Sequence, residues 1–91
     1  MELKWTSKAL SDLTRLHEFL SPLNKQAAVA TVQILTATPA KLMAQPRLGE
    51  RLEEFDLREV RRILVSHYEM RYEIQHSTIY VLRLWHTRED R

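Results

Sequence analysis

The sequence predicts a single α+β domain of two layers, with the element order β-α-α-β-β-β. A short N-terminal strand and an antiparallel helical hairpin are expected to pack on a three-stranded antiparallel meander. Two observations predict this class. Apolar residues recur every three to four positions in the first half of the chain, and from Arg58 the period changes to two. The 91 residues suffice for one thin core, so we assign residues 1–91 to one domain.

The first helix is the best-defined element of the N-terminal half. Residues 3–5 predict a short strand, and Thr6 predicts the helix N-terminus because its hydroxyl can accept hydrogen bonds from the next turn. One apolar stripe follows at helical spacing: Ala9, Leu13, Leu16 and Leu20. Three charged residues are expected off this stripe: Asp12, Arg15 and Glu18. Ser21 and Pro22 predict the end of this helix and the start of the next.

The second helix is predicted from its own stripe of Ala28, Val32 and Leu35. The very short link between the helices predicts that they run antiparallel. Thr38 and Pro39 predict a break, followed by a short helical turn through Met43. Residues 45–49 then predict an irregular loop.

The C-terminal half predicts three strands joined by tight turns. If Ser66 and His67 form a two-residue turn, one face of the first hairpin is mostly apolar, with the opposed pairs Val65–Tyr68, Ile63–Met70 and Arg61–Tyr72. The other face then carries the pairs Leu64–Glu69, Arg62–Arg71 and Val60–Glu73. In the last strand, apolar residues occupy both faces, so this strand is either central or bulged. Its spacing leaves open which way Arg83 and His86 point.

Composition excludes several classes of protein. The sequence has no cysteine, which excludes disulfides, thiolate metal sites and a cysteine nucleophile. No apolar run approaches the roughly 20 residues needed to span a bilayer, and the first residues lack the pattern of a signal peptide. We therefore expect a cytoplasmic protein without membrane contact. The only glycine, Gly49, excludes a glycine-rich phosphate loop.

The charges are distributed unevenly. The net charge of +2 is too small to indicate nucleic-acid binding. Residues 1–46 carry five basic and three acidic side chains, whereas residues 47–91 carry nine arginines, no lysine and nine acids. The rigid guanidinium fork suits carboxylate, phosphate and aromatic partners. The C-terminal half therefore predicts ion pairs of defined geometry, either within the chain or with a partner.

The expected Arg62–Arg71 pair bears directly on whether the arginines bind acids of the chain itself or those of a partner. Like charges directly opposite each other on a sheet are destabilising. An acidic neighbour such as Glu69 or Glu73 would relieve the repulsion, and so would a bound anion or the carboxylate of a partner. The sequence leaves these alternatives open.

Three stretches carry a resemblance to a known family. They are Pro46-Arg47-Leu48-Gly49, Arg61-x-Ile63-x-Val65-Ser-His-Tyr68-x-Met70-x-Tyr72, and Ile79-x-Val81-Leu82-Arg83-Leu84-Trp85-His86-Thr87-Arg88-Glu89-Asp90. In this order and spacing, the chain resembles the RelE/ParE superfamily of bacterial type II toxins along nearly its whole length. The closing stretch from His86 to Asp90 is similar to the ParE-like branch in particular.

The resemblance implies a RelE-like fold and one of two activities. ParE-like members inhibit DNA gyrase, whereas RelE-like members are ribosome-dependent, metal-free endoribonucleases that cleave mRNA. Both are neutralised by a cognate antitoxin, usually a DNA-binding protein with a flexible C-terminal segment that wraps around the toxin. The pair commonly represses its own operon, so operator DNA would be contacted only indirectly, through the antitoxin. Growth inhibition and plasmid stabilisation are the associated roles, and no cofactor or metal is implied.

A ribonuclease would need a proton donor or acceptor beside groups that hold phosphate. The candidates are His86 for proton transfer, with Arg62, Arg71, Arg83 and Arg88 as phosphate ligands. Each also has a structural interpretation. His86 can be bonded to the backbone at a strand end, and Arg88 can pair with a nearby acid. Arg83 can hold Glu69 or Glu73.

The inhibitor hypothesis is favoured because nine acids lie in the half that would carry the nuclease site, and no tyrosine follows His86. It assigns no catalytic residue. Its candidate partner contacts are Arg62, Arg71, Arg83 and Trp85, and the arginines would meet acidic residues of the antitoxin. Trp5 and Trp85 are either anchors for a protein partner or core residues. An exposed edge strand and a groove beside the helices are expected to receive the antitoxin. A third hypothesis is an antitoxin-binding remnant that has lost toxicity.

Overall fold

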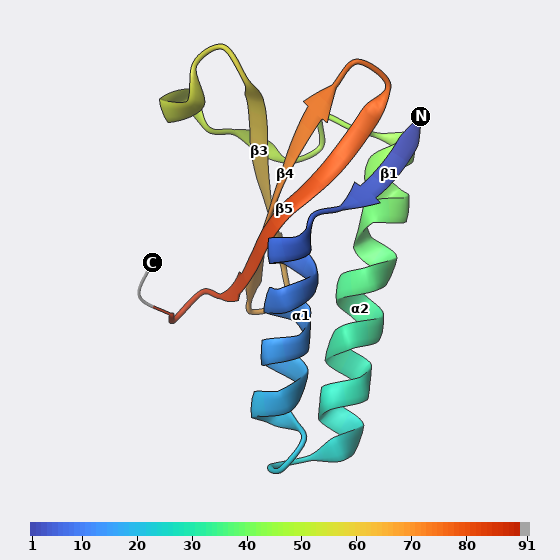
Figure 1. The fold of residues 1–91 in the computed structure, drawn as a ribbon, viewed down its shortest axis with the longest axis vertical. Helices are drawn as coiled ribbons and strands as arrows, with labels where there is room; N and C mark the ends of the chain where they lie inside the picture. Colours follow the sequence, from blue (N-terminus) through green and yellow to red (C-terminus); the bar gives the residue numbers. More distant parts are fainter. Residues whose placement is uncertain (90–91) are drawn as a thin grey trace.

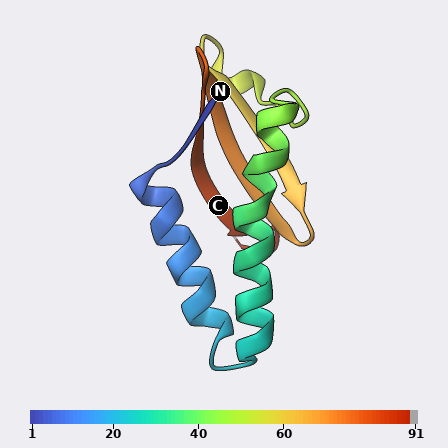
Figure 2. The same cartoon turned by 90° about the vertical axis from the view of Figure 1, so that its right-hand side faces the viewer.

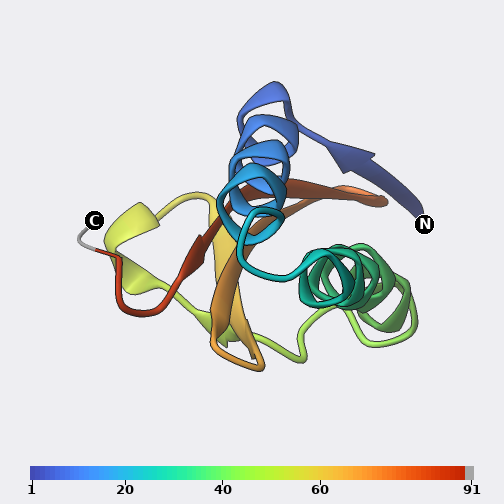
Figure 3. The same ribbon diagram turned by 90° about the horizontal axis from the view of Figure 1, so that it is seen from below.

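The computed structural model describes residues 1–89 and has the predicted α+β class. Its elements are, in order, β1 (Glu2–Trp5), α1 (Ser7–Leu20), α2 (Lys25–Ala44), β2 (Glu50–Arg51), the 3-10 turn η1 (Glu53–Phe55), β3 (Glu59–Val65), β4 (Tyr68–Gln75) and β5 (Thr78–His86). Within these residues the helices α1 and α2 form an antiparallel pair that extends well beyond one end of the sheet (Figures 1 and 2). Figure 3 shows α1 directly against β5, with α2 alongside.

The sheet is larger than the predicted meander. Its strand order is β1-β5-β4-β3-β2, because β1 joins the edge of β5 in parallel and the short β2 pairs with β3. The predicted register of the β3–β4 hairpin is confirmed, with Val65 opposite Tyr68 and Arg62 opposite Arg71. The buried core lies between the sheet and the two helices and contains Leu16, Leu35, Leu42, Met70, Tyr72, Ile79, Val81 and Leu84.

Strand β5 is both central and bulged. It lies between β1 and β4, and its pairing with β4 shifts register so that Arg71 lies opposite Arg83 but Tyr72 lies opposite Val81. Leu82 is therefore an extra residue without a partner on β4. The bulge allows both Val81 and Leu84 to be fully buried, although three positions separate them.

Helix α2 differs from the expectation in its bounds. It begins at Lys25, with Asn24 as the N-cap, because the Asn24 side chain accepts a hydrogen bond from the Ala27 N–H; Ser21 instead terminates α1. The predicted break at Pro39 is wrong, and the helix runs unbroken to Ala44. Pro39 and Leu42 are fully buried, so tertiary packing outweighs the cost of the missing proline N–H.

Helix α2 also corrects the expectation about apolar runs. Its 20 residues have a mean hydropathy of 1.2 over an 18-residue window, which is long and apolar enough to cross a membrane by length and composition. In this fold the helix packs on α1 and the sheet, and Ala28 and Leu35 are completely buried. Apolar residues of α2 therefore build part of the core of the domain.

The loop before the sheet is fixed by one buried tyrosine. The Tyr72 hydroxyl donates to the Pro46 carbonyl at 2.7 Å and accepts from the Gly49 N–H at 2.9 Å. A Cβ at Gly49 would lie 2.6 Å from the Arg62 carbonyl oxygen, so this close approach requires glycine. Burial raises the pKa of Tyr72, which keeps its hydroxyl protonated as a donor.

Helix α1 completes the edge of β5 beyond the end of β1. As predicted, Thr6 caps the helix by accepting from the Ala9 N–H, and its hydroxyl also donates to the Val81 carbonyl. Nearly two turns after Thr6, the Asp12 carboxylate accepts from the Leu84 N–H at 2.9 Å and from Arg83 Nε at 2.8 Å. The expectation that Asp12 lies off the buried stripe is wrong, since it is only 5% exposed. Its carboxylate takes the place of a neighbouring strand.

Asp12 generates a prediction about stability and pH. Burial favours its neutral form, but hydrogen bonds from Arg83 and the Leu84 N–H, with the charges of Arg83 and Arg15, outweigh this and lower its pKa. A folded-state pKa below the unfolded value stabilises the fold above about pH 4, and this contribution is lost as the pH falls through the folded-state pKa. We expect Asp12→Asn to lower the free energy of unfolding by about 2 kcal/mol at neutral pH.

Urea denaturation at pH 7 and pH 3 measures this effect. The difference between the variant and the wild type should shrink at the lower pH, because the carboxyl of the unfolded wild-type chain is then largely protonated and folding no longer gains the full benefit of the lowered pKa. Glu18→Gln, an exposed change on the same helix, is the control and should change stability by less than about 0.5 kcal/mol. An Asp12→Asn variant as stable as this control would contradict the proposed role of the carboxylate.

Candidate functional site

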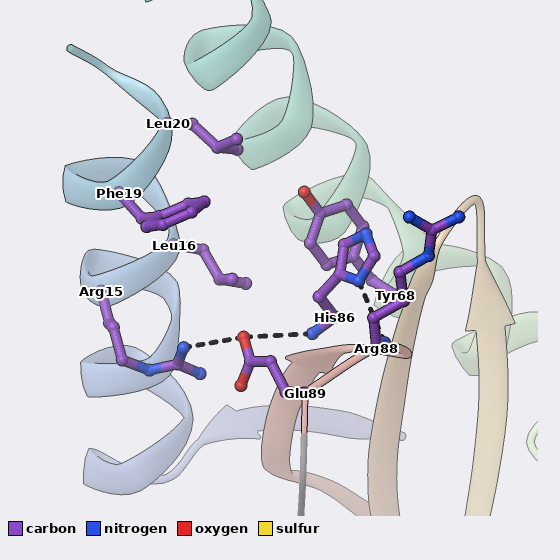
Figure 4. Close-up of a pocket in the computed structure, with 8 residues that line it drawn as sticks. All are labelled: Arg15, Leu16, Phe19, Leu20, Tyr68, His86, Arg88 and Glu89. Atoms are coloured by element: carbon purple, nitrogen blue, oxygen red, sulfur yellow. Dashed lines mark hydrogen bonds and ion pairs between the residues drawn. The ribbon is translucent and has the colours of Figure 1, made fainter. Parts of the chain in front are cut away.

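The part of the chain that the structure describes has two cavities of functional interest, on opposite faces of the sheet. The larger one, which we name the apolar groove, encloses about 610 Å³ beside α1. Figure 4 shows its lining residues: Arg15, Leu16, Phe19, Leu20, Tyr68, His86, Arg88 and Glu89. It forms because α1 extends past the end of the sheet, so that Phe19 and Leu20 face Tyr68 and His86 across an open space. Phe19 is 68% exposed.

Charged side chains close one end of the apolar groove. Arg15 Nη1 donates to Glu89 Oε1 at 2.8 Å, and the same carboxylate oxygen accepts from the His86 N–H at 3.4 Å. Arg15 also lies 3.7 Å from Asp12. Glu89 therefore holds residues 87–89 against α1.

His86 has the structural arrangement expected for a strand-end histidine bonded to the backbone. Its Nδ1 accepts from the Arg88 N–H at 3.1 Å, which places the proton of the neutral ring on Nε2. Its ring packs edge-on against Tyr68 at 5.2 Å and stacks with His67 at 6.1 Å between centroids. The expected ion pair of Arg88 with a nearby acid is not made with any carboxylate of residues 1–89.

The second cavity, which we name the cationic cavity, lies on the face of the sheet away from the core and encloses about 390 Å³. It is lined by Thr6, Ser7, Lys8, Phe55, Arg58, Val60, Arg71, Leu82 and Arg83. Its cations come from α1, from β4, from β5 and from the segment before β3. The structure thereby places Arg71 and Arg83 in a different cavity from His86 and Arg88.

The Arg62–Arg71 pair is confirmed and is neutralised within the chain. Glu69 binds both guanidinium groups, with Arg62 Nη1 at 3.3 Å and Arg71 Nε at 3.1 Å. Arg62 also bonds Glu50 at 2.9 Å, and these carboxylates raise its pKa. The sequence left open what relieves the repulsion between Arg62 and Arg71. In the structure, the acidic neighbour Glu69 of the same chain does so. The Glu69 side chain is only 9% exposed, so it is a buried centre of this network.

Arg83 has a different partner from those expected. It binds Asp12 on α1 through two hydrogen bonds, at 2.8 and 3.2 Å, and not Glu69 or Glu73. The hydrogen bonds and charge of Asp12 raise the pKa of Arg83. Glu73 is bound instead by Arg58, at 2.7 and 3.0 Å, and its pKa is lowered chiefly by that bond.

The two tryptophans are mainly structural. Trp85 is 8% exposed, and the Arg71 guanidinium lies over its ring at 4.8 Å from the centroid. Trp85 therefore offers a partner little exposed surface, and Arg71 covers part of one face of its ring. Trp5 on β1 is half-buried and packs against the core.

The geometry does not assemble the ribonuclease candidates into one site. Tyr68 and His86 lie on the helix side of the sheet with Met70, whereas Arg71 and Arg83 point to the opposite face because neighbouring residues alternate along a strand. A proton donor at His86 would therefore be separated by the sheet from these phosphate ligands. Among residues 1–89, no group of three acidic or histidine side chains is placed to hold a metal ion.

Sequence reasoning missed, among others, the acid that fixes Arg83, one apolar residue of the groove and one cation of the cationic cavity. Asp12 follows Ala9 by three positions and precedes Leu16 by four, so its place on the buried stripe was visible in the spacing. Phe19 lies one position off the stripe and could not be distinguished from an ordinary exposed residue. Lys8 joins the cationic cavity only because the start of α1 lies beside β5.

Sequence comparison identifies the family. The profile of the ParE toxin of the type II toxin–antitoxin system, parDE, matches residues 3–91. The chain belongs to the ParE toxin family. Asp90, which ends the stretch similar to the ParE-like branch, lies within this match but outside the residues that the structure describes.

A solved structure has the same fold as this ParE family member. The chain from the chromosomal ParDE toxin–antitoxin system of P. aeruginosa superposes with a TM-score of 0.78 at 22% sequence identity. The match covers 94% of this chain and 95% of that chain, so the two share the complete fold. None of the curated proteins compared matches the sequence.

The Glu69 network generates a second prediction. Glu69→Gln should lower the free energy of unfolding by about 2–3 kcal/mol, because it leaves Arg62 and Arg71 opposed without a buried counter-charge. Thermal or urea denaturation measures this loss. Glu50→Gln removes the more exposed partner of Arg62 and should cost less than about 1 kcal/mol. Equal losses for the two variants would show that Glu69 does not hold the pair together.

Proposed function

We propose that the chain is a cytoplasmic toxin that inhibits DNA gyrase and is neutralised by a cognate antitoxin. Membership of the ParE toxin family supports the toxin role. The separation of His86 from Arg71 and Arg83 favours inhibition over RNA cleavage, since a ribonuclease needs its acid and base beside the phosphate ligands. This geometry is the single observation on which the choice between the two activities depends.

The apolar groove is the proposed binding site for an amphipathic helix of the antitoxin. It offers Leu16, Phe19, Leu20 and Tyr68 as an apolar floor with Arg15 and Arg88 at its rim. A helix that inserts apolar residues at intervals of three and four positions fits such a groove. Acidic residues of this antitoxin helix would form ion pairs with Arg15 and Arg88 at the rim of the groove.

The edge of β3 is the proposed site for strand addition. β2 pairs only with Arg61 and Arg62, so residues 63–65 have no strand neighbour on that side among the described residues. Leu64, in the middle of this segment, is 58% exposed. An extended antitoxin segment could complete the sheet here while its neighbouring residues fold into the groove.

Arg62, Arg71, Arg83 and Trp85 are retained as proposed partner contacts, with one revision. The three guanidinium groups already have internal carboxylates, so an acidic partner would share them and would not relieve an unpaired charge. Operator DNA is proposed to be contacted only through the antitoxin.

The groove generates a third prediction. Phe19→Asp should weaken antitoxin binding at least about tenfold, because burial of one phenylalanine contributes about 1.5–3 kcal/mol. The fold should remain intact, since Phe19 is 68% exposed. Co-expression with the antitoxin gene of the same operon, followed by co-purification and calorimetry, measures this loss.

Leu23→Asp is the matched control, because Leu23 is 74% exposed in the α1–α2 turn and does not line the groove. It should bind the antitoxin as the wild type does. The proposed groove is wrong if Phe19→Asp is neutralised and captured as efficiently as this control.

Gyrase inhibition is the fourth prediction. Induced cells should arrest, filament and activate the response to DNA damage, and the purified toxin should block supercoiling by gyrase. Messenger RNA should stay intact. Unimpaired supercoiling at excess toxin would contradict gyrase as the target. Codon-phased messenger cleavage that disappears in a His86→Ala or Arg83→Ala variant that remains folded would instead establish the ribonuclease. Normal growth on induction would favour the non-toxic remnant.

A further inference from the structure

The cationic cavity gathers two of the proposed partner contacts, Arg71 and Arg83, with two further cations that the proposed function does not use. Four of its lining residues are basic, namely Lys8, Arg58, Arg71 and Arg83, and none of the described residues that line it is acidic. The carboxylates that bind the three arginines lie behind them and are nearly buried, with side-chain exposures of 6% for Glu73, 7% for Asp12 and 9% for Glu69. The cavity therefore presents donors to solvent while the counter-charges stay on its inner side.

Each arginine has hydrogen-bond donors left after its internal ion pair. Arg58 and Arg83 bind their carboxylates through Nε and Nη2, and Arg71 binds Glu69 through Nε. This leaves Nη1 of Arg58 and of Arg83, and both terminal nitrogens of Arg71, without a carboxylate among residues 1–89. Lys8 is exposed and makes no ion pair with a described residue.

These donors are already ordered. The Arg71 guanidinium lies over Trp85 at 4.8 Å and over Phe55 at 5.9 Å, and Arg58 lies over Phe55 at 5.7 Å. In addition, a carboxylate binds the Nε of each of the three arginines and fixes the orientation of its guanidinium. Binding of a ligand would therefore cost less side-chain entropy than it does at flexible arginines, because these side chains are ordered before the ligand binds.

The start of α1 adds to this arrangement. Ser7 and Lys8 line the cavity and are the first residues of a 14-residue helix, so their N–H groups have no partner within the helix. The donors thus converge from α1, from β4, from β5 and from the segment before β3. A tetrahedral anion presents oxygens in several directions, whereas a carboxylate presents two in one plane.

We propose that the cationic cavity binds a phosphate group of a nucleic-acid backbone. The volume of about 390 Å³ is much larger than a single phosphate needs, and the partly exposed Phe55 and Leu82 supply apolar surface for the adjoining sugar. The modest net charge of +2 fits a contact with one or two phosphates and not with a long tract of backbone. This inference is independent of gyrase inhibition, because it concerns binding by the purified chain alone.

The test uses the purified full chain and NMR signals from the arginine Nε–H groups and the backbone. A thymidine oligomer of about ten nucleotides and inorganic phosphate should both shift the Arg71 and Arg83 Nε–H signals and the Ser7 and Lys8 amides saturably. The logarithm of the oligomer affinity should fall against the logarithm of salt concentration with a slope near −1, as expected for one or two phosphates on a single strand.

Lys8→Gln should weaken oligomer binding about fivefold without changing the fold, because Lys8 is exposed and holds no described partner. Lys4→Gln is the matched control, since Lys4 is an exposed lysine on β1 outside the cavity, and it should leave the affinity unchanged.

Shifts caused by a glutamate-rich peptide but not by the oligomer would overturn the nucleic-acid assignment in favour of an acidic protein segment. Saturation by phosphate without oligomer binding would overturn it in favour of a small phosphate compound. The absence of saturable shifts with every probe would overturn the site itself.

Discussion

The contact between Asp12 and the edge of β5 is the constraint on which both cavities depend. β1 pairs with β5 only as far as Val81, so the backbone beyond that point needs partners from elsewhere. Asp12 supplies an acceptor for the Leu84 N–H and at the same time fixes Arg83. Because α1 must run along this edge, its first turn borders one face of the sheet and its last turns overhang the end of the other. The cationic cavity and the apolar groove are consequences of this one placement.

The arginines of the C-terminal half serve mainly to hold the sheet together, and their remaining donors face solvent. One face of the sheet carries Arg62, Arg71 and Glu69 in a network that would be destabilised by the loss of its single buried acid. Arg62 is bound by two carboxylates, whereas Arg58, Arg71 and Arg83 each keep at least one terminal nitrogen that no carboxylate of residues 1–89 binds. A chain with almost balanced charge can thereby present a locally positive surface. The local geometry of the charges, and not their sum, determines what this face of the protein can bind.

The predicted features that the structure confirms are those set by neighbours in the sequence. The β3–β4 register follows from a tight turn and from alternation, because a slip by one residue would expose the apolar side chains. The cap at Thr6 depends on the backbone only three residues away. The break expected at Pro39 also rested on local reasoning, and it failed because the burial of Leu35, Pro39 and Leu42 together offsets the cost of the proline.

The sequence alone therefore determined the fold class, the helical stripe, the hairpin register and the opposition of Arg62 to Arg71. The tertiary structure alone decided that β1 extends the sheet beside β5, that Asp12 and not a sheet glutamate binds Arg83, and that His86 and Arg83 serve different cavities. The physical reason is sequence separation. Periodicity and turn chemistry act over a few residues, whereas the bond between Arg83 and Asp12 joins positions 71 residues apart. Only packing of the complete chain determines which of several acids meets a given arginine.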